Sequence, residues 1–250
     1  PFGSGLSSSA AIEVATAIAL CEIAKIPYDL VEIAKHCRRA ENEYCGVNCG
    51  IMDQFASAMG KKDCAVLLDC KTLEYEYVPL KLKDYAIVVA NCNKPHNLVE
   101  SKYNVRRHEV ETALKAIQKV KPEVACLAEL TPKEFNEVKY VLSGVVSKRA
   151  EHVVMECKRV QDAVEALKAG DLVELGRLLN ESHYSLRDLY EVTGRELDTL
   201  SALARKETGC LGSRMIGAGF GGCTISIVKK SAVEGFIRRV GKAYFDAIGY

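Results

Sequence analysis

The chain begins with a glycine- and serine-rich loop that runs directly into an apolar helix, and this junction restricts the fold more than any other feature. In the opening string PFGSGLSSSAA, Gly3 and Gly5 allow backbone conformations closed to other residues and a close approach to a ligand. Ser7, Ser8 and Ser9 supply hydroxyl and N–H groups at the helix start, where the positive end of the helix dipole attracts phosphate. A plain serine-capped helix after a flexible loop explains this segment equally well by itself.

Two common nucleotide-binding patterns do not fit the glycines of this chain. The opening loop is not a Walker loop, because no Gly-Lys-Ser/Thr follows, and it lacks the preceding strand of a dinucleotide fingerprint. Residues 217–222 read GAGFGG and match G-x-G-x-x-G as a string. The following CTISIV predicts a strand, however, where a dinucleotide loop opens a helix. This segment is either a glycine-dense turn that packs against a loop or ligand, or a tight entry to a strand.

Hydrophobic periodicity predicts helices and strands that are mixed without strict alternation. Helical patterns cover residues 9–24, 28–44, 52–59, most of 101–208 and 232–248, and strand patterns cover 64–70, 85–91 and the residues from 223. This order is typical of an α+β fold rather than a doubly wound parallel sheet. The dense apolar residues of 9–24 predict a largely buried helix. Gly170 and Asp171 predict the end of one helix and the cap of the next.

Charge and cysteine content exclude several classes of protein. The 250 residues carry a net charge of +1, so we expect neither a nucleic acid nor a membrane partner. We expect Arg38, Arg39, Arg106 and Arg107 on solvated helix faces. The most apolar run, residues 14–24, is too short and too charged to span a bilayer. The 11 cysteines form no Cys-x-x-Cys pair, which favours reduced thiols and a cytoplasmic location.

Two acidic residues lie near glycine-marked breaks between helices. Asp53 opens a short helix in the segment CGIMDQF, and Glu41 precedes it near the end of another helix. Loop closure can bring both carboxylates to one cleft. An aspartate at a helix start is more usually a capping residue, and the spacing alone favours that interpretation.

Three segments together resemble one family of enzymes. PFGSGLSSSAA, CGIMDQF and GAGFGGCTISIV, in this order, are similar to the second motif, the catalytic-aspartate segment and the third motif of the galactokinases, in the GHMP small-molecule kinase superfamily. NKPHNLVESKYNVRR, AEHVVMECKRV, ALKAGDL and NESHYSLRDLYEVTGRELDTL also resemble galactokinases, so the resemblance covers essentially the whole chain. It implies the two-domain α+β fold of the GHMP kinases. Residues 1–80 would be the C-terminal part of the ATP-binding domain, and residues 81–250 the C-terminal domain.

The resemblance implies transfer of phosphate from ATP to the C1 hydroxyl of α-D-galactose, with Mg²⁺. Ser9 and Glu41 are implied as the magnesium ligands, with Glu43 ranked second. One hydroxyl and one carboxylate suffice, because Mg²⁺ takes its other oxygens from phosphate and water. The residues implied to wrap the ATP phosphates are Gly3, Ser4, Gly5, Leu6, Ser7, Ser8 and Ser9.

The resemblance also implies residues for catalysis and sugar binding. Asp53 corresponds to the catalytic aspartate, which contacts the sugar and takes or orients the proton of the attacking hydroxyl. Tyr103, in SKYNVRR, corresponds to a tyrosine that contacts the sugar. The expected partners are therefore galactose and ATP, bound by a monomer.

The first family motif, an Arg-x-Asn-Leu-x-Gly-Glu-His-like segment with sugar ligands, has no counterpart in this sequence. We therefore expect an N-terminally truncated galactokinase fragment that is inactive by itself. Because the missing segment largely sets the sugar choice, a kinase of N-acetylgalactosamine, galacturonate or arabinose stays an alternative. A non-catalytic galactose-binding regulator is disfavoured, because Ser9, Glu41 and Asp53 are all present.

Overall fold

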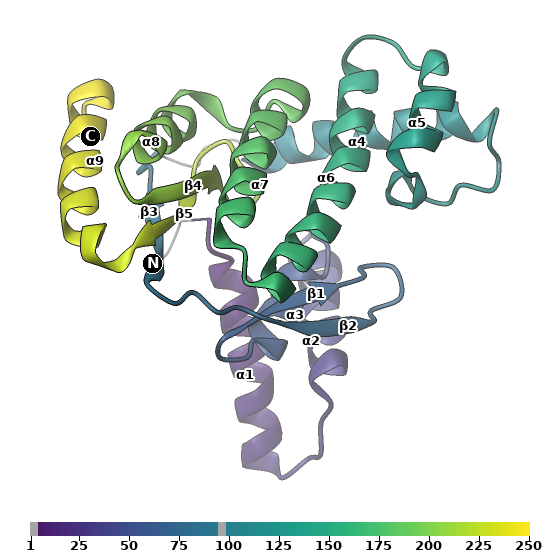
Figure 1. Ribbon diagram of the computed structural model, residues 1–250. Coiled ribbons are helices and arrows are strands. Elements are labelled where there is room, and N and C mark those ends of the chain that lie inside the picture. Colours follow the sequence, from purple (N-terminus) through teal and green to yellow (C-terminus); the bar gives the residue numbers. More distant parts are fainter. Residues whose placement is uncertain (1–4, 95–98) are drawn as a thin grey trace. The chain divides into compact units, whose positions relative to one another are not determined.

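A computed structural model describes residues 5–94 and 99–250 of the chain, without the side chains of residues 99–101. The chain divides into two compact units, Pro1–Lys81 and Leu82–Tyr250. Both contain helices and strands, which confirms the predicted α+β class (Figure 1). Within the described ranges, none of the helices combines the length and the apolar character needed to cross a membrane.

The described residues of the first unit form three α-helices and a β-hairpin; the helices and the first strand lie close to the predicted bounds, whereas the second strand is not predicted. Helix α2 begins where the Asp29 carboxylate accepts the backbone N–H groups of Val31 and Glu32. It continues into a π-helical turn, Ala40–Tyr44. The elements are α1 (Ser8–Ala24), α2 (Leu30–Arg39), α3 (Met52–Met59) and the antiparallel strands β1 (Cys64–Leu68) and β2 (Tyr75–Pro79).

Helix α1 is much more exposed than its composition predicts. Of its residues, Ala10 and Val14 are buried, whereas Ile12 is 66% exposed and Ile23 is 80% exposed. In this chain α2 and α3 pack against α1, and Val14 joins the core of the unit through Ile33 and Cys37. The prediction of a largely buried helix is therefore wrong for this chain, because these two neighbours cover one side of α1.

The second unit is built on a three-stranded antiparallel sheet, in the order β3-β5-β4. Its strands are β3 (Tyr85–Asn91), β4 (Cys210–Met215) and β5 (Cys223–Lys229). The sequence predicts β3 and β5 but not β4, whose segment CLGSRM contains no β-branched or aromatic residue. Packing rather than local preference stabilises β4, because α7 and α8 lie against it.

Six helices accompany this sheet. Helices α8 and α9 share a core with the sheet, and α4 packs with α6 around a second core that includes Phe135 of α5. Gly170 ends α6 in the left-handed region and Asp171 caps α7, as predicted. The helices are α4 (Val99–Gln118), α5 (Pro132–Val138), α6 (Gly144–Ala169), α7 (Leu172–Ser185), α8 (Gly194–Lys206) and α9 (Val233–Ile248).

Two glycines allow α7 to lie directly on β4. A Cβ atom on Gly212 would lie 2.1 Å from the carbonyl oxygen of Gly176, and one on Gly176 would lie 2.5 Å from that of Leu211. Because backbone atoms stand at both places, neither clash is relieved by a side-chain movement. The contact between helix and strand therefore requires glycine at both positions.

We expect Gly212→Ala to destabilise the protein by about 1–3 kcal/mol, because the added methyl group forces α7 away from β4. Gly241→Ala is the matched control. Gly241 is an exposed position of α9 with nothing within 4 Å of a Cβ, so this change should stabilise by up to about 1 kcal/mol. Urea unfolding followed by circular dichroism measures both. Equal midpoints for Gly212→Ala and the wild type would contradict the close packing.

Candidate functional site

The start of α1 presents backbone donors that no side chain caps among the described residues. Gly5 and Ser7 both have positive φ, at 70° and 55°, and Ser7 precedes the helix without a capping side-chain hydrogen bond. A left-handed serine is uncommon and costs on the order of 1 kcal/mol, and such strain gathers at functional sites. The uncapped N–H groups and the helix dipole suit an anion. Gly3 and Ser4, assigned to the same loop, lie outside the described residues.

Ser9 lies in the first turn of α1 and is exposed. Glu13 follows four residues later, so the two side chains lie on the same face of the helix, one turn apart. Glu13 is partly buried, and its Oε2 atom is buried without a hydrogen-bond partner. A carboxylate thus stands directly behind the exposed serine hydroxyl.

Glu41 forms a cluster with Glu13 and Cys45. It lies in the π-helical turn after α2 and is only 7% exposed. One carboxylate oxygen of Glu13, one of Glu41 and the Cys45 sulfur all lie within 4.8 Å of one another. Within the described part of the chain, neither carboxylate forms an ion pair with a basic side chain. The unit therefore holds two neighbouring acids without an internal counter-charge.

The surroundings of Glu13 raise the pKa of its carboxyl group. Burial raises it above its usual value, and the charge of Glu41 raises it further. Hydrogen bonding to the amide of Gln54 opposes the rise. Gln54 is only 2% exposed, so it belongs to the same buried polar group.

The residues present fit a divalent cation. Two carboxylates without a counter-charge, one with an unpartnered buried oxygen, form a site of hard oxygen donors, which Mg²⁺ prefers. Glu41 lies in this cluster. Glu43 is instead exposed, and its Oε2 atom lies 3.5 Å from Nε of Arg39. The sequence motifs indicate Glu41 but not Glu13. The signal for Glu13 was its spacing of one helical turn from Ser9.

Asp53 lies in the first turn of α3, and its side chain is exposed. It is not one of the three members of the cluster. No capping hydrogen bond from a side chain begins this helix, so the alternative role of Asp53 as a cap has no support.

In the second unit, Tyr103 lies near the start of α4 and is 39% exposed. Its neighbour Tyr190 is largely buried, and burial is the main cause of a raised Tyr190 pKa, with a smaller effect from Tyr103. A cavity of about 430 Å³ opens in this unit beside α4 and the start of α8. The residues that line it are Lys94, Lys102, Val105, Arg106, Glu191, Val192, Thr193, Gly194 and Phe220.

The loop of residues 217–222 closes against the segment that precedes α8. The backbone N–H of Phe220 donates to the Val192 carbonyl oxygen at 2.6 Å. A Cβ atom on Gly219 would lie 2.2 Å from that oxygen, and Gly219 has a φ of +84°. The loop leads into strand β5, which confirms that its glycine string does not open a helix.

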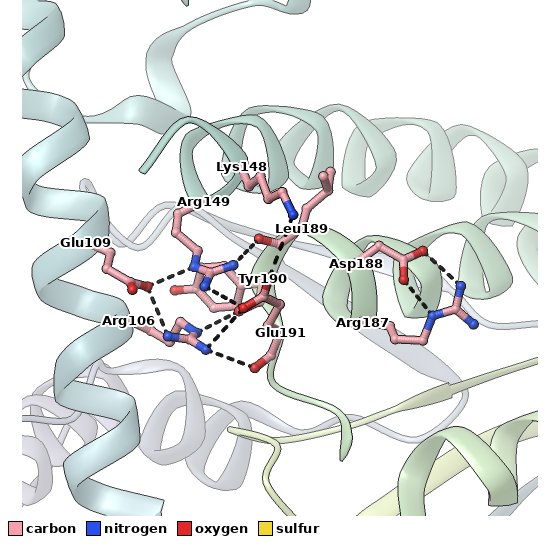
Figure 2. A network of polar contacts seen from close by, with 9 residues as sticks. All are labelled: Arg106, Glu109, Lys148, Arg149, Arg187, Asp188, Leu189, Tyr190 and Glu191. Carbon is pink, nitrogen blue, oxygen red and sulfur yellow. Dashed lines mark hydrogen bonds and ion pairs between the residues drawn. The ribbon is translucent and has the colours of Figure 1, made fainter. Parts of the chain in front are cut away.

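A network of charges around the buried Arg149 also contacts the residues that lead into α8 (Figure 2). Arg149 of α6 is 1% exposed. Its Nε donates to Glu109 of α4 at 2.8 Å, and Nη2 donates to Glu191 at 2.9 Å. Nη1 donates to the Leu189 carbonyl oxygen at 2.5 Å. One guanidinium therefore ties two helices to the residues that lead into α8.

Arg106 belongs to this network, contrary to its predicted place on a solvated face. Its Nε donates to the Tyr190 carbonyl oxygen at 2.7 Å and Nη1 to Glu109 at 3.0 Å. Arg107 does lie on the surface, paired with Glu111. The reason is the turn of the helix, since adjacent residues point about 100° apart.

Models of two family domains match the chain. The GHMP kinases N terminal domain matches residues 1–61, and the GHMP kinases C terminal matches residues 163–247. Among curated proteins, the chain is 56% identical to a galactokinase of Clostridium acetobutylicum and 54% identical to one of Fusobacterium nucleatum. Both matches cover 100% of this chain and 64% of the relative, so the chain spans just under two thirds of their length.

Solved structures agree. Lactococcus lactis galactokinase complexed with galactose superposes with a TM-score of 0.96 at 45% identity, over 100% of this chain and 64% of that one. Mevalonate kinase of L. major, in complex with R-mevalonate, gives a TM-score of 0.61 at 21% identity, over 95% of this chain and 61% of that one. The second likeness shows the fold alone.

We expect Arg149→Met to destabilise the protein by about 3–5 kcal/mol, because it removes the buried cation that pairs Glu109 and Glu191. Arg107→Met is the matched control at an exposed arginine outside this network, which pairs with Glu111 on the surface of α4, and it should cost less than about 0.5 kcal/mol. Urea unfolding followed by circular dichroism gives both values. Equal losses in the two variants would contradict the central place of Arg149.

Proposed function

The chain belongs to the GHMP kinases, and from that membership we propose that the full-length protein containing it is a galactokinase. It transfers the γ-phosphoryl group of ATP to the C1 hydroxyl of α-D-galactose. The observation that carries the proposal is the likeness, over the whole of this chain, to a galactokinase crystallised with galactose. Identity above one half with curated galactokinases supports it.

The start of α1 is the proposed phosphate site. Its uncapped N–H groups and the left-handed turn at Ser7 suit the oxygens of ATP. We assign Ser9 and Glu41 as the ligands of Mg²⁺. Ser9 lies on the same face of α1 as Glu13, one turn away, and the Glu13 carboxylate lies beside that of the buried Glu41. When bound, Mg²⁺ neutralises negative charge on the phosphates.

Asp53 is the proposed proton acceptor. The C1 oxygen of the sugar forms a bond to the γ-phosphorus, and the bond from that phosphorus to the β–γ bridging oxygen breaks, which releases ADP. The hydroxyl proton passes to the Asp53 carboxylate. Because phosphoryl transfer needs little covalent help, orienting the hydroxyl is a large part of this role. The exposed position of Asp53 leaves it accessible to a sugar.

Tyr103 is the proposed sugar contact in the second unit. Its exposed side chain offers both a phenol group and an aromatic face. The Arg149 network fixes the position of α4, the helix that carries Tyr103, because Arg106 and Glu109 of this network also lie on α4. All 11 cysteines are free thiols, which supports a cytoplasmic location. We further propose a monomer.

Galactose turnover by the full-length protein tests the assignment. Asp53→Asn should lower kcat by roughly 10²–10⁴-fold, because the amide keeps the shape but accepts no proton. Glu41→Gln should raise the Mg²⁺ concentration for half-maximal rate by roughly 10-fold or more. Glu43→Gln, the same change at an exposed position two residues away, should leave both unchanged.

A coupled ADP-release assay over a series of Mg²⁺ concentrations separates the two effects. Near wild-type kcat in Asp53→Asn would remove the assigned proton acceptor. A shift in Mg²⁺ dependence for Glu43→Gln but not for Glu41→Gln would show that Glu43, and not Glu41, is the carboxylate ligand of Mg²⁺.

A further inference from the structure

Cys45 brings a sulfur atom to a site that the proposed reaction uses only through oxygen. Cys45 directly follows the π-helical turn, and its N–H donates to the carbonyl oxygen of Ala40 at 3.1 Å. This wider turn places Cys45 four residues after Glu41 on the same side. The Cys45 sulfur and carboxylate oxygens of Glu13 and Glu41 all lie within 4.8 Å of one another.

Two buried oxygen atoms beside this cluster have no partner among the described residues. One is Oε2 of Glu13 and the other is Oε1 of Gln54. Gln54 is 2% exposed, and its amide lies close enough to Glu13 to lower the pKa of that carboxyl group. An unpartnered buried polar atom costs about 1–3 kcal/mol. A bound cation with its water ligands would relieve both.

We propose that Glu13, Glu41 and Cys45 form a binding site for a thiophilic divalent cation such as Zn²⁺. Zinc accepts thiolate and carboxylate ligands together, in a tetrahedron completed by water, whereas Mg²⁺ takes oxygen alone. Cys45 is therefore surplus for magnesium and decisive for zinc. Two ligands of a tetrahedral zinc ion lie about 3.5 Å apart, so an inward shift of about 1 Å closes the site.

Binding exchanges the proton of the Cys45 thiol for the metal. The S–H bond breaks, the proton passes to solvent, and a metal–sulfur bond forms without any change in oxidation state. Because Glu41 serves both metals, Zn²⁺ and Mg²⁺ exclude each other here. Zinc binding itself needs neither nucleotide nor sugar, so it stands apart from the proposed kinase activity.

Cobalt(II) is a direct probe, because a thiolate ligand gives it a charge-transfer band in the near ultraviolet. We expect this band in the metal-free full-length protein on addition of Co²⁺, and its loss on addition of Zn²⁺. Cys45→Ser should abolish the band and weaken Zn²⁺ binding, measured by calorimetry, by roughly 10-fold or more. Glu13→Gln should keep the band but weaken Zn²⁺ binding.

Cys70→Ser is the matched control. Cys70 is another exposed cysteine of the first unit and is not a member of the cluster, so its loss should change neither the band nor the affinity. Far-ultraviolet circular dichroism verifies that each variant is folded. A charge-transfer band that survives in Cys45→Ser, or no band in the wild type, would overturn the site. Loss of galactose turnover in either cysteine variant would instead concern the proposed function.

Discussion

One buried guanidinium organises the second unit. Arg149 is almost inaccessible to water and donates to Glu109, Glu191 and a backbone carbonyl, so α4, α6 and the segment before α8 meet at one cation (Figure 2). A buried charge whose three nitrogens each donate a hydrogen bond favours one geometry, since any shift leaves a charge unpaired. Tyr103 lies on α4 and the glycine loop hydrogen-bonds Val192. The positions of α4, which carries the proposed sugar contact, and of the segment that the loop contacts therefore depend on Arg149.

The first unit differs from the second in how its acidic side chains are paired. Glu13 and Glu41 lie together, and in the described residues no basic side chain pairs with them. Burial and mutual repulsion raise the pKa of Glu13, which is the expected cost of two acids that share a site. Such an arrangement is suited to a ligand that supplies the positive charge.

Local pattern predicted much of the fold. Helices α1, α2, α3 and α9 and strands β3 and β5 lie where the sequence pattern indicates, because each is a run rich in apolar residues, and glycine or proline follows each of these helices. Strand β4 was missed because contacts with α7 and α8 stabilise it rather than its own residues. Arg106 was misplaced and Arg149 overlooked for the same reason, since their partners are distant in sequence. For the site, the motifs indicated Ser9, Glu41 and Asp53, but Glu13 required the helix geometry.

The position of the transferred phosphate tests the central proposal most directly. The full-length protein is incubated with ATP, Mg²⁺ and, separately, galactose, N-acetylgalactosamine, galacturonate and arabinose, and the products are analysed by phosphorus–proton correlation spectroscopy. We predict that galactose reacts fastest and that the product phosphorus couples to the anomeric proton of the α-sugar. Phosphorylation at another hydroxyl, a faster reaction with another sugar, or the absence of any sugar phosphate would contradict the assignment.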